Sequence, residues 1–199
     1  MTVDLVCWDF GDTLVDERFM RIAPDGVPEW GRVYEAVLAE RAEWLEGWDL
    51  GRGSLNDLVA PLADRLPMTQ AEVVRHLRIV WGRITWFPDS KAWVNQLAGK
   101  VPQAVVTVNP HEFSGIARAC GLDVRIPVIV TSAELGTLSK LAMAERARCI
   151  LGLRPGLSTT VLVDNKQANL DEFTVGGGQA ILYEQQSTCL DTLATLILT

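Results

Sequence analysis

Residues that could perform phosphate chemistry lie at or just beyond the ends of apolar runs in this chain. Asp9 follows the run VDLVCW, Asn109 follows VPQAVVTV, and Asp164 closes the run STTVLVD. Two carboxylates brought together repel each other, so Asp9 and Asp164 would attract a hard cation such as Mg²⁺. Lys140 and the hydroxyl of Thr107 could hold the oxygens of a phosphate. A carboxylate beside such a cation can also attack phosphorus as a nucleophile.

These residues need a sheet whose strand ends meet, and the apolar runs predict one. Five short segments rich in Val, Ile and Leu are typical of parallel strands covered on both faces: 3–8, 101–108, 126–132, 158–164 and 178–183. Helical patterns follow at 89–100, 112–122, 138–153, 166–176 and 188–198. This alternation indicates an α/β fold with a parallel sheet. Ligands bind beyond the carboxyl ends of such strands, so we expect the polar residues named above to converge there.

Residues 17–87 interrupt the alternation, because they contain no convincing strand. Amphipathic patterns predict three helices there, at 27–48, 54–66 and 68–84. Thr69 is a good N-cap for the third, and Glu72 three places later completes a capping box. The sequence therefore predicts a helical module inserted after the first strand.

The expected domain organisation follows from this insertion. Residues 1–16 and 88–199 would form the α/β core, and residues 17–87 would form the all-helical module. Most of the tryptophans fall within the module, at positions 30, 44, 48, 81 and 86. We expect them to pack inside the module, in preference to forming an aromatic box around a ligand.

Composition and charge restrict the partners. The formal net charge of −7 argues against a nucleic-acid surface and against an anionic membrane. No apolar stretch is long enough to span a bilayer, and strand-like sequence begins at Val3 without a signal peptide. The four cysteines form no CxxC pair, and three lie in apolar segments, so we expect reduced, buried thiols. The chain reads as a cytoplasmic protein with a small-molecule substrate; its oligomeric state is not encoded in any recognisable pattern.

Four motifs in order resemble those of the haloacid dehalogenase (HAD) superfamily, in its phosphatase-like form. The stretch 9–14 (DFGDTL) resembles the first motif, whose opening aspartate is the family's nucleophile. Thr107, followed by Asn109, resembles the second, a phosphate-binding hydroxyl, and Lys140 resembles the third, a lysine that neutralises phosphate and nucleophile. The stretch 163–169 (VDNKQAN) resembles the fourth, whose aspartate holds Mg²⁺.

The resemblance implies a Rossmann-like core, a helical cap of the type called C1 at residues 17–87, and Mg²⁺ as cofactor. It implies a phosphohydrolase that acts on a small phosphorylated metabolite through an aspartyl-phosphate intermediate. The implied catalytic residues are Asp9, Asp12, Thr107 and Lys140; the implied substrate contacts are Thr107, Asn109 and Lys140; the implied metal ligands are Asp9, the Gly11 carbonyl and Asp164.

Three features depart from the family pattern. Gly11 stands where the family has a second aspartate, which protonates the leaving group and then activates water. Asp12 lies one residue later, and a shift of one residue normally points a side chain elsewhere, unless a tight loop rotates it back. Asn165 stands where a second acid is frequent in the fourth motif. The spacing from Gly136 to Lys140 is one residue longer than the family pattern.

Other functions are weighed against the phosphatase. Gly11 favours a HAD-like binding or regulatory protein that has lost its acid. A haloacid dehalogenase uses an aspartate nucleophile without metal and would have little use for Asp164. A phospho-receiver domain also uses acids, a threonine and a lysine, but the helical insertion argues against it. A histidine metal site is disfavoured because the chain has only His76 and His111, and we expect His76 to be a surface or packing residue.

Overall fold

A five-stranded, all-parallel sheet forms the centre of the computed structural model, which describes residues 3–185 and 191–198. The strands are β1 (Leu5–Trp8), β2 (Gln103–Thr107), β3 (Val128–Thr131), β4 (Thr160–Asp164) and β5 (Gln179–Leu182). Their spatial order is β3-β2-β1-β4-β5. The order reverses between β1 and β4, and in open α/β sheets that reversal is where ligands bind. The predicted α/β fold with a parallel sheet is confirmed.

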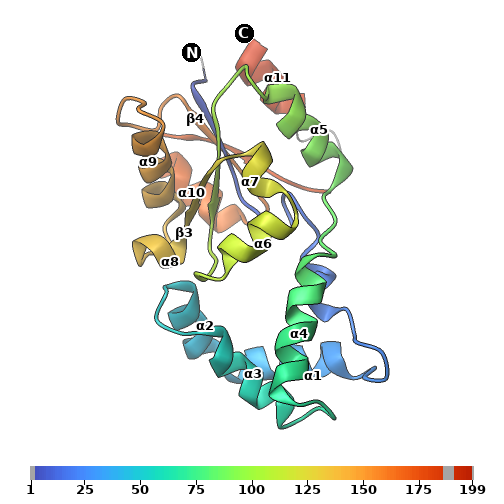
Figure 1. Ribbon diagram of the computed structural model, residues 1–199. Coiled ribbons are helices and arrows are strands. Elements are labelled where there is room, and N and C mark those ends of the chain that lie inside the picture. The colour runs from blue at the N-terminus through green and yellow to red at the C-terminus, as the bar shows by residue number, and fades with distance from the viewer. Residues whose placement is uncertain (1–2, 186–190, 199) are drawn as a thin grey trace.

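Helices cover both faces of the sheet (Figure 1). One face carries α5 (Pro88–Leu97), α6 (Phe113–Ala119), α7 (Leu122–Arg125) and α11 (Asp191–Leu198). The other carries α9 (Lys140–Ile150) and α10 (Gln167–Val175). Side chains alternate along β1, so Trp8 packs with Phe113 on the first face, whereas Cys7 packs with Phe173 on the second. Burial on both faces explains the continuous apolar runs of the strands.

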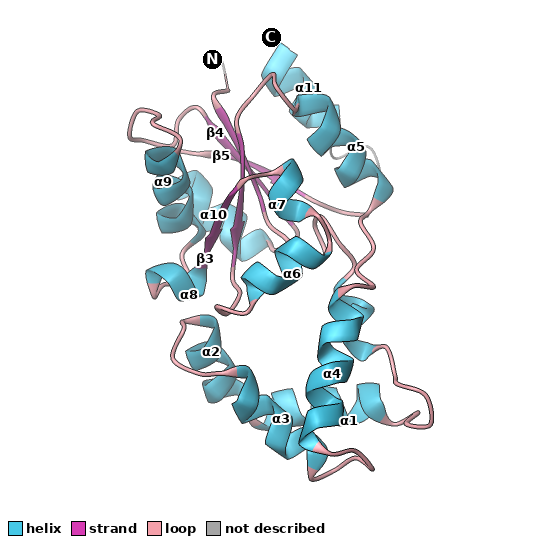
Figure 2. Ribbon diagram, viewed as in Figure 1, coloured by secondary structure: helices cyan, strands magenta, loops and turns pink. Residues whose placement is uncertain are grey.

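The helical segment, defined here as residues 17–87, contains one 3₁₀ helix and four α-helices. They are η1 (Glu17–Arg21), α1 (Trp30–Glu40), α2 (Ala42–Asp49), α3 (Leu55–Ala63) and α4 (Gln70–Trp81). They pack around an apolar cluster of their own, which includes Trp30, Leu58 and Leu77. Figure 2 shows this group of helices beyond the end of the sheet, with α2 close to α8 (Ser132–Leu135), the short helix that follows β3.

The predicted single helix over 27–48 is wrong. The chain breaks at Arg41, whose backbone angles (φ −125°, ψ 35°) leave the helical region between α1 and α2. The break is held by a contact distant in sequence, because an Arg41 guanidinium nitrogen donates to the Asp57 carbonyl oxygen at 2.5 Å. No glycine or proline marks it. By contrast, the predicted capping box is confirmed: the Glu72 carboxylate accepts from the Thr69 backbone nitrogen at 2.8 Å.

The tryptophans divide between packing and cavity lining. Trp30 and Trp48 are buried in the cluster of the helical segment, and Trp44 packs against it, as predicted. The prediction is wrong for Trp81 and Trp86, which pack with the apolar cluster of the α/β core. The Trp86 indole nitrogen donates to the Cys120 carbonyl oxygen at 3.3 Å. Trp48 and Trp81 also line a cavity described below.

The predictions for the described cysteines and for His76 are confirmed in part. Cys7 is buried, and burial raises the pKa of its thiol to about 12. Cys120 is half-buried and Cys149 is exposed, so the expectation of buried thiols is wrong for Cys149; Cys189 lies outside the described residues. His76, expected to be either a surface or a packing residue, is a packing residue. Its ring meets Trp30 edge to face.

Candidate active site at the strand ends

Two carboxylates and one ammonium group meet at the carboxyl ends of β1 and β4. Lys140 Nζ lies 2.5 Å from Asp9 Oδ1 and 3.4 Å from Asp164 Oδ2, and it donates to the Val106 carbonyl oxygen at 2.7 Å. The Lys140 and Asp164 side chains are 1% and 0% exposed. The structure thus brings together the three charged residues that the sequence placed at strand and helix ends.

The charges in this group are not balanced, since one lysine faces two carboxylates. Burial raises the pKa of Asp164, and the negative charge of Asp9 raises it further. The lysine and two hydrogen bonds oppose that rise: Asp164 accepts from the backbone nitrogen of Lys166 at 2.8 Å and from the side-chain amide of Asn169 at 2.9 Å. A second cation would find favourable electrostatics here.

Lys140 reaches this position because it is the first residue of α9. The hydroxyl of Ser139 caps the helix by accepting from the Ala142 nitrogen at 3.3 Å. A positive charge at a helix N-terminus is unfavourable, because the helix dipole is positive there. The two buried carboxylates offset this cost. The Lys140 ammonium is therefore bound by buried carboxylates and is not a solvated surface charge.

Thr107 and Asn109 lie together at the end of β2. Thr107 is buried, and its hydroxyl accepts from the Asn109 side-chain amide at 2.7 Å. The Asn109 backbone nitrogen donates to the hydroxyl of Ser132 at 2.9 Å. The two residues are thus held beside Val106, whose carbonyl oxygen binds Lys140. Their expected role as phosphate contacts stays a prediction.

Asp12, the residue after Gly11, lies in a turn, and its expected catalytic role stays a prediction. It has a positive φ of 51°, the only such value outside glycine in the described part of the chain. Its carboxylate accepts from the Glu17 backbone nitrogen at 3.2 Å, which points it toward the start of η1. Gly11 itself lies outside the positive-φ region, so its backbone conformation does not require a glycine.

The carboxyl group of Glu17 occupies the space next to Gly11, and sequence reasoning missed this residue. A Cβ built on Gly11 would overlap the Glu17 Oε1 and Cδ atoms and lie 2.6 Å from its Cγ. Glu17 is exposed as a residue, yet its carboxyl end lies among protein atoms. This loss of water raises the pKa of Glu17 to about 6, and the charges of Asp12 and Asp9 add to the rise. No motif or period in the sequence marks Glu17, because only the folded turn brings it to Gly11.

The residues fit a divalent cation by their chemistry. Mg²⁺ prefers oxygen ligands and commonly takes one or two carboxylates, with water filling the other positions. Asp9 and Asp164 supply the carboxylates. The side-chain oxygen of Asn165 is buried and has no hydrogen-bond partner among the described residues, as expected of an oxygen that awaits a ligand or its water. No group of three or more His, Cys, Asp or Glu side chains suited to a metal occurs in residues 3–185 and 191–198, so water and neutral oxygens would complete the shell.

A cavity of about 380 Å³ opens between the strand ends and the helical segment. Phe10, Asn109 and Lys166 line it from the core and Glu17 lines it from η1, while the other lining residues are largely apolar or aromatic and include Tyr34, Leu45, Trp48 and Trp81. Asp49 also lines it, and burial raises the pKa of that carboxyl to about 6. The dimensions suit a small molecule.

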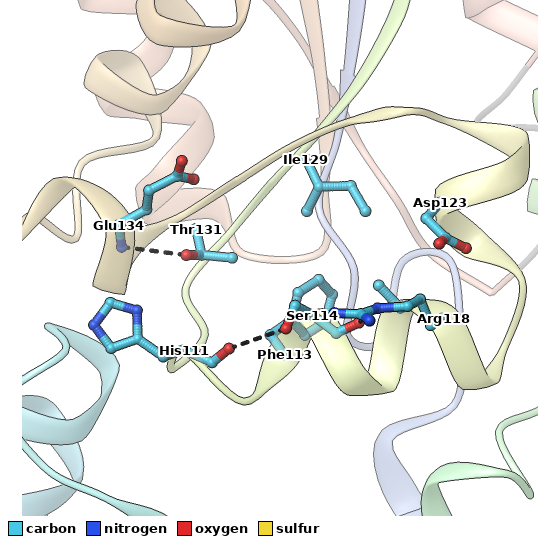
Figure 3. A pocket seen from close by; sticks show the side chains of 9 residues that line it. His111, Phe113, Ser114, Arg118, Asp123, Ile129, Thr131 and Glu134 are labelled. Carbon is cyan, nitrogen blue, oxygen red and sulfur yellow. Dashed lines mark hydrogen bonds between the residues drawn. The ribbon is translucent and has the colours of Figure 1, made fainter.

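A second cavity, of about 330 Å³, lies at the β3 edge of the sheet (Figure 3). His111, Arg118, Thr131 and Glu134 surround it. The Thr131 hydroxyl is bonded within the same segment, because it accepts from the Glu134 backbone nitrogen at 3.3 Å. It contains none of the residues predicted from the motifs.

Comparison with known proteins rests on structure alone. No family model matches the chain, and no curated protein matches it. Among solved structures, a predicted HAD-like family hydrolase from Porphyromonas gingivalis aligns over 100% of both chains with a TM-score of 0.69 and 12% identity.

Two further structures differ in chemistry. An L-2-haloacid dehalogenase from Xanthobacter autotrophicus, with chloropropionic acid covalently bound, has a TM-score of 0.65 and 13% identity over 98% of this chain and 84% of that one. A HAD family enzyme from Bacteroides thetaiotaomicron, in complex with magnesium and inorganic phosphate, has a TM-score of 0.63 and 9% identity over 92% of this chain and 95% of that one. The chain has the fold of the HAD-like hydrolases.

Proposed function

We propose that the protein is a Mg²⁺-dependent phosphohydrolase that cleaves a small phosphorylated metabolite through an aspartyl-phosphate on Asp9. The observation that carries the proposal is the buried group of two carboxylates around one ammonium, Asp9 and Asp164 with Lys140 between them. Among the described residues Lys140 is the cation paired with both carboxylates, which leaves the group with one negative charge in excess. A divalent cation would neutralise this excess charge, and its remaining positive charge would attract a phosphate group.

Each residue has a task that follows from its place. Lys140 holds Oδ1 of Asp9, which leaves Oδ2 free to attack phosphorus in line with the departing oxygen. The lysine also offsets charge on the phosphate oxygens. Thr107 and Asn109, joined by their hydrogen bond, present a hydroxyl and an amide beside that position. Bound Mg²⁺ would supply charge neutralisation for the phosphate, held by Asp9, the Gly11 carbonyl and Asp164.

A dehalogenase is the second candidate, because a haloacid dehalogenase shares the fold over nearly the whole chain. In that chemistry an aspartate displaces halide without a metal. Asp164 argues against it, since a buried carboxylate facing the nucleophile would repel a second anionic group, the carboxylate of a haloacid. The helical segment would serve as the cap that supplies specificity in either case.

The two candidates separate in one set of assays. The purified protein is incubated with an aryl phosphate, an alkyl phosphate, acetyl phosphate and 2-chloropropionate, each with Mg²⁺ or with EDTA. We expect phosphate release that requires Mg²⁺ and disappears in Asp9→Asn, because an amide cannot attack phosphorus. Asp164→Asn should raise the Mg²⁺ concentration needed for half-maximal rate.

The matched control is Glu43→Gln, which changes an exposed carboxylate on α2 that does not line the cavity. It should behave as the unmodified protein does. Chloride release that is unaffected by EDTA would establish the dehalogenase instead. Phosphate release that persists in Asp9→Asn would remove Asp9 from its assigned role.

A further inference from the structure

We infer that Glu17 is the acid–base residue of the proposed phosphohydrolase, its carboxyl group standing in the space left by the absent side chain of Gly11. The inference rests on the proposed function and adds a residue to it. It is carried by the position of one side chain, by the turn that holds it there, and by the cavity that it faces.

The position is defined by steric exclusion. Any side chain on residue 11 would begin inside the carboxyl group of Glu17, because a Cβ there overlaps Oε1 and Cδ. Glycine at position 11 and glutamate at position 17 are therefore complementary: the first makes the room that the second fills. The carboxyl group of Glu17 thus lies beside Gly11, which is two residues after the Asp9 nucleophile at the carboxyl end of β1.

The turn between them is fixed at several points. The Asp12 nitrogen donates to the Val15 carbonyl oxygen at 2.8 Å, and the Asp12 carboxylate accepts from the Glu17 nitrogen at 3.2 Å. The Asp16 nitrogen donates to the Thr85 carbonyl oxygen at 3.2 Å, which ties the turn to the returning chain. Asp12 is accordingly a positioning residue, which holds the backbone of Glu17 in place.

The lining of the cavity of about 380 Å³ separates Glu17 from Asp12. Glu17 lines it together with Phe10, Asn109 and Lys166, whereas Asp12 is absent from its lining. We place the leaving group of the substrate in this cavity, where Glu17 is one of the lining residues. Asp49 also lines the cavity, but no contact places its carboxyl group beside Gly11, as the Glu17 carboxyl is placed.

Hydrolysis with Glu17 as the acid–base residue takes two steps. In the first, Asp9 Oδ2 forms a bond to phosphorus, the bond from phosphorus to the ester oxygen breaks, and the Glu17 carboxyl gives its proton to that oxygen, releasing an alcohol. In the second, the Glu17 carboxylate takes a proton from water as the water oxygen bonds to phosphorus. The bond from phosphorus to Asp9 breaks, which releases inorganic phosphate and restores both carboxyl groups to their starting states.

Glu17→Gln tests the inference, because the amide keeps the shape but cannot donate a proton in this way. A positioned general acid contributes about 10²–10⁴-fold, and basic leaving groups need it most. We therefore expect an alkyl phosphate to lose about 10²–10⁴-fold in kcat, while an aryl phosphate loses far less in its first step. Glu43→Gln, the exposed control, should leave both rates unchanged.

A rescue variant distinguishes chemistry from loss of structure. Gly11→Asp combined with Glu17→Ala places a carboxyl at position 11 and removes the group that would collide with it. This pair should recover alkyl phosphate hydrolysis relative to Glu17→Ala alone. Urea unfolding of each variant, which does not depend on activity, should show that the folded state is retained.

Trapping gives an independent readout. With acetyl phosphate and Mg²⁺, Glu17→Gln should accumulate phosphorylated protein, detected by intact mass spectrometry, because acetate leaves without an acid whereas the second step has lost its base. If the unmodified protein releases phosphate but Glu17→Gln slows the first step equally for alkyl and aryl phosphates, or slows neither, the inference about Glu17 is overturned and the proposed function stands. If the unmodified protein releases no phosphate from any ester, both fall together.

Discussion

Replacing Lys140 with methionine should destabilise the protein strongly and make its stability depend on Mg²⁺. The ammonium of Lys140 is the group that lies between Asp9 and Asp164, at 2.5 Å and 3.4 Å. Methionine has a similar length and no charge, so it would leave two buried carboxylates facing each other. The hydrogen bond to the Val106 carbonyl oxygen would be lost as well.

The magnitude follows from the burial of all three side chains. Removing one partner of a buried ion pair costs about 3–5 kcal/mol, because the remaining charge stays away from water without compensation. A domain is stable by only about 5–15 kcal/mol, so Lys140→Met would use up a large share of the total. In the Asp164→Asn background the cost should be smaller, since only one carboxylate then loses its partner.

Urea unfolding, followed by tryptophan fluorescence with EDTA or with millimolar Mg²⁺, measures these differences. Mg²⁺ should stabilise Lys140→Met more than the unmodified protein, because the cation takes over the neutralising role of the lysine. At a concentration about 100 times its Kd a ligand adds about 2.7 kcal/mol. The reasoning is refuted if Lys140→Met unfolds within about 1 kcal/mol of the unmodified protein, or if Mg²⁺ stabilises both equally.

Two further predictions concern the helical segment. Burial lowers the pKa of His76, whose Nε2 donates to the Ile22 carbonyl oxygen at 2.8 Å. Below about pH 6.5 the unfolded chain therefore binds the proton more readily, and stability should fall as pH falls; His76→Gln should show a shallower loss between pH 7.5 and 5.5 in urea unfolding, and an unchanged slope would contradict the assignment. Gly51 has a φ of +77°, and a Cβ there would lie 2.9 Å from the Ala133 carbonyl oxygen, whereas Gly26 has a φ of +78° with open space around it. Both glycine-to-alanine changes should cost about 1–2 kcal/mol for the backbone, but Gly51→Ala should cost more in thermal or urea unfolding; equal losses would show that the contact with α8 carries no weight.

The strands were predictable because their physics is local. A parallel strand buried on both faces must be apolar at nearly every position, so β1, β2 and β4 appear as continuous runs and end where polar residues begin. Asp9 and Asp164 could be placed for the same reason. Helix lengths were less accessible: the break at Arg41 depends on a contact with Asp57, and the four-residue α7 and α8 are too short to show a period.

The site was predictable where residues follow strands, and unpredictable where the chain turns back on itself. Sequence alone identified Gly11 as the departure from the motif and offered Asp12 as its replacement. The positive φ of Asp12 directs that carboxylate to the Glu17 nitrogen instead. The carboxyl beside Gly11 comes from six residues along the chain, a separation set by the turn and by no helical or strand period.

A seam of hydrogen bonds joins α2 and α3 to the starts of α6 and α8, beside the cavity of about 380 Å³. Both carboxylate oxygens of Glu112 are engaged across it: one accepts from the Trp48 indole nitrogen at 3.0 Å and the other from the Leu55 backbone nitrogen at 2.9 Å. The Ser132 hydroxyl adds a bond to the Asp49 carbonyl oxygen at 2.5 Å. Each such bond is worth only about 0.5–1.5 kcal/mol net, because water replaces the lost partner when the seam parts. Breaking these three bonds would therefore cost little compared with unfolding the core. If the proposed hydrolysis takes place in this cavity, separation of α2 and α3 from Glu112 and Ser132 is the motion that would widen its opening at the lowest cost.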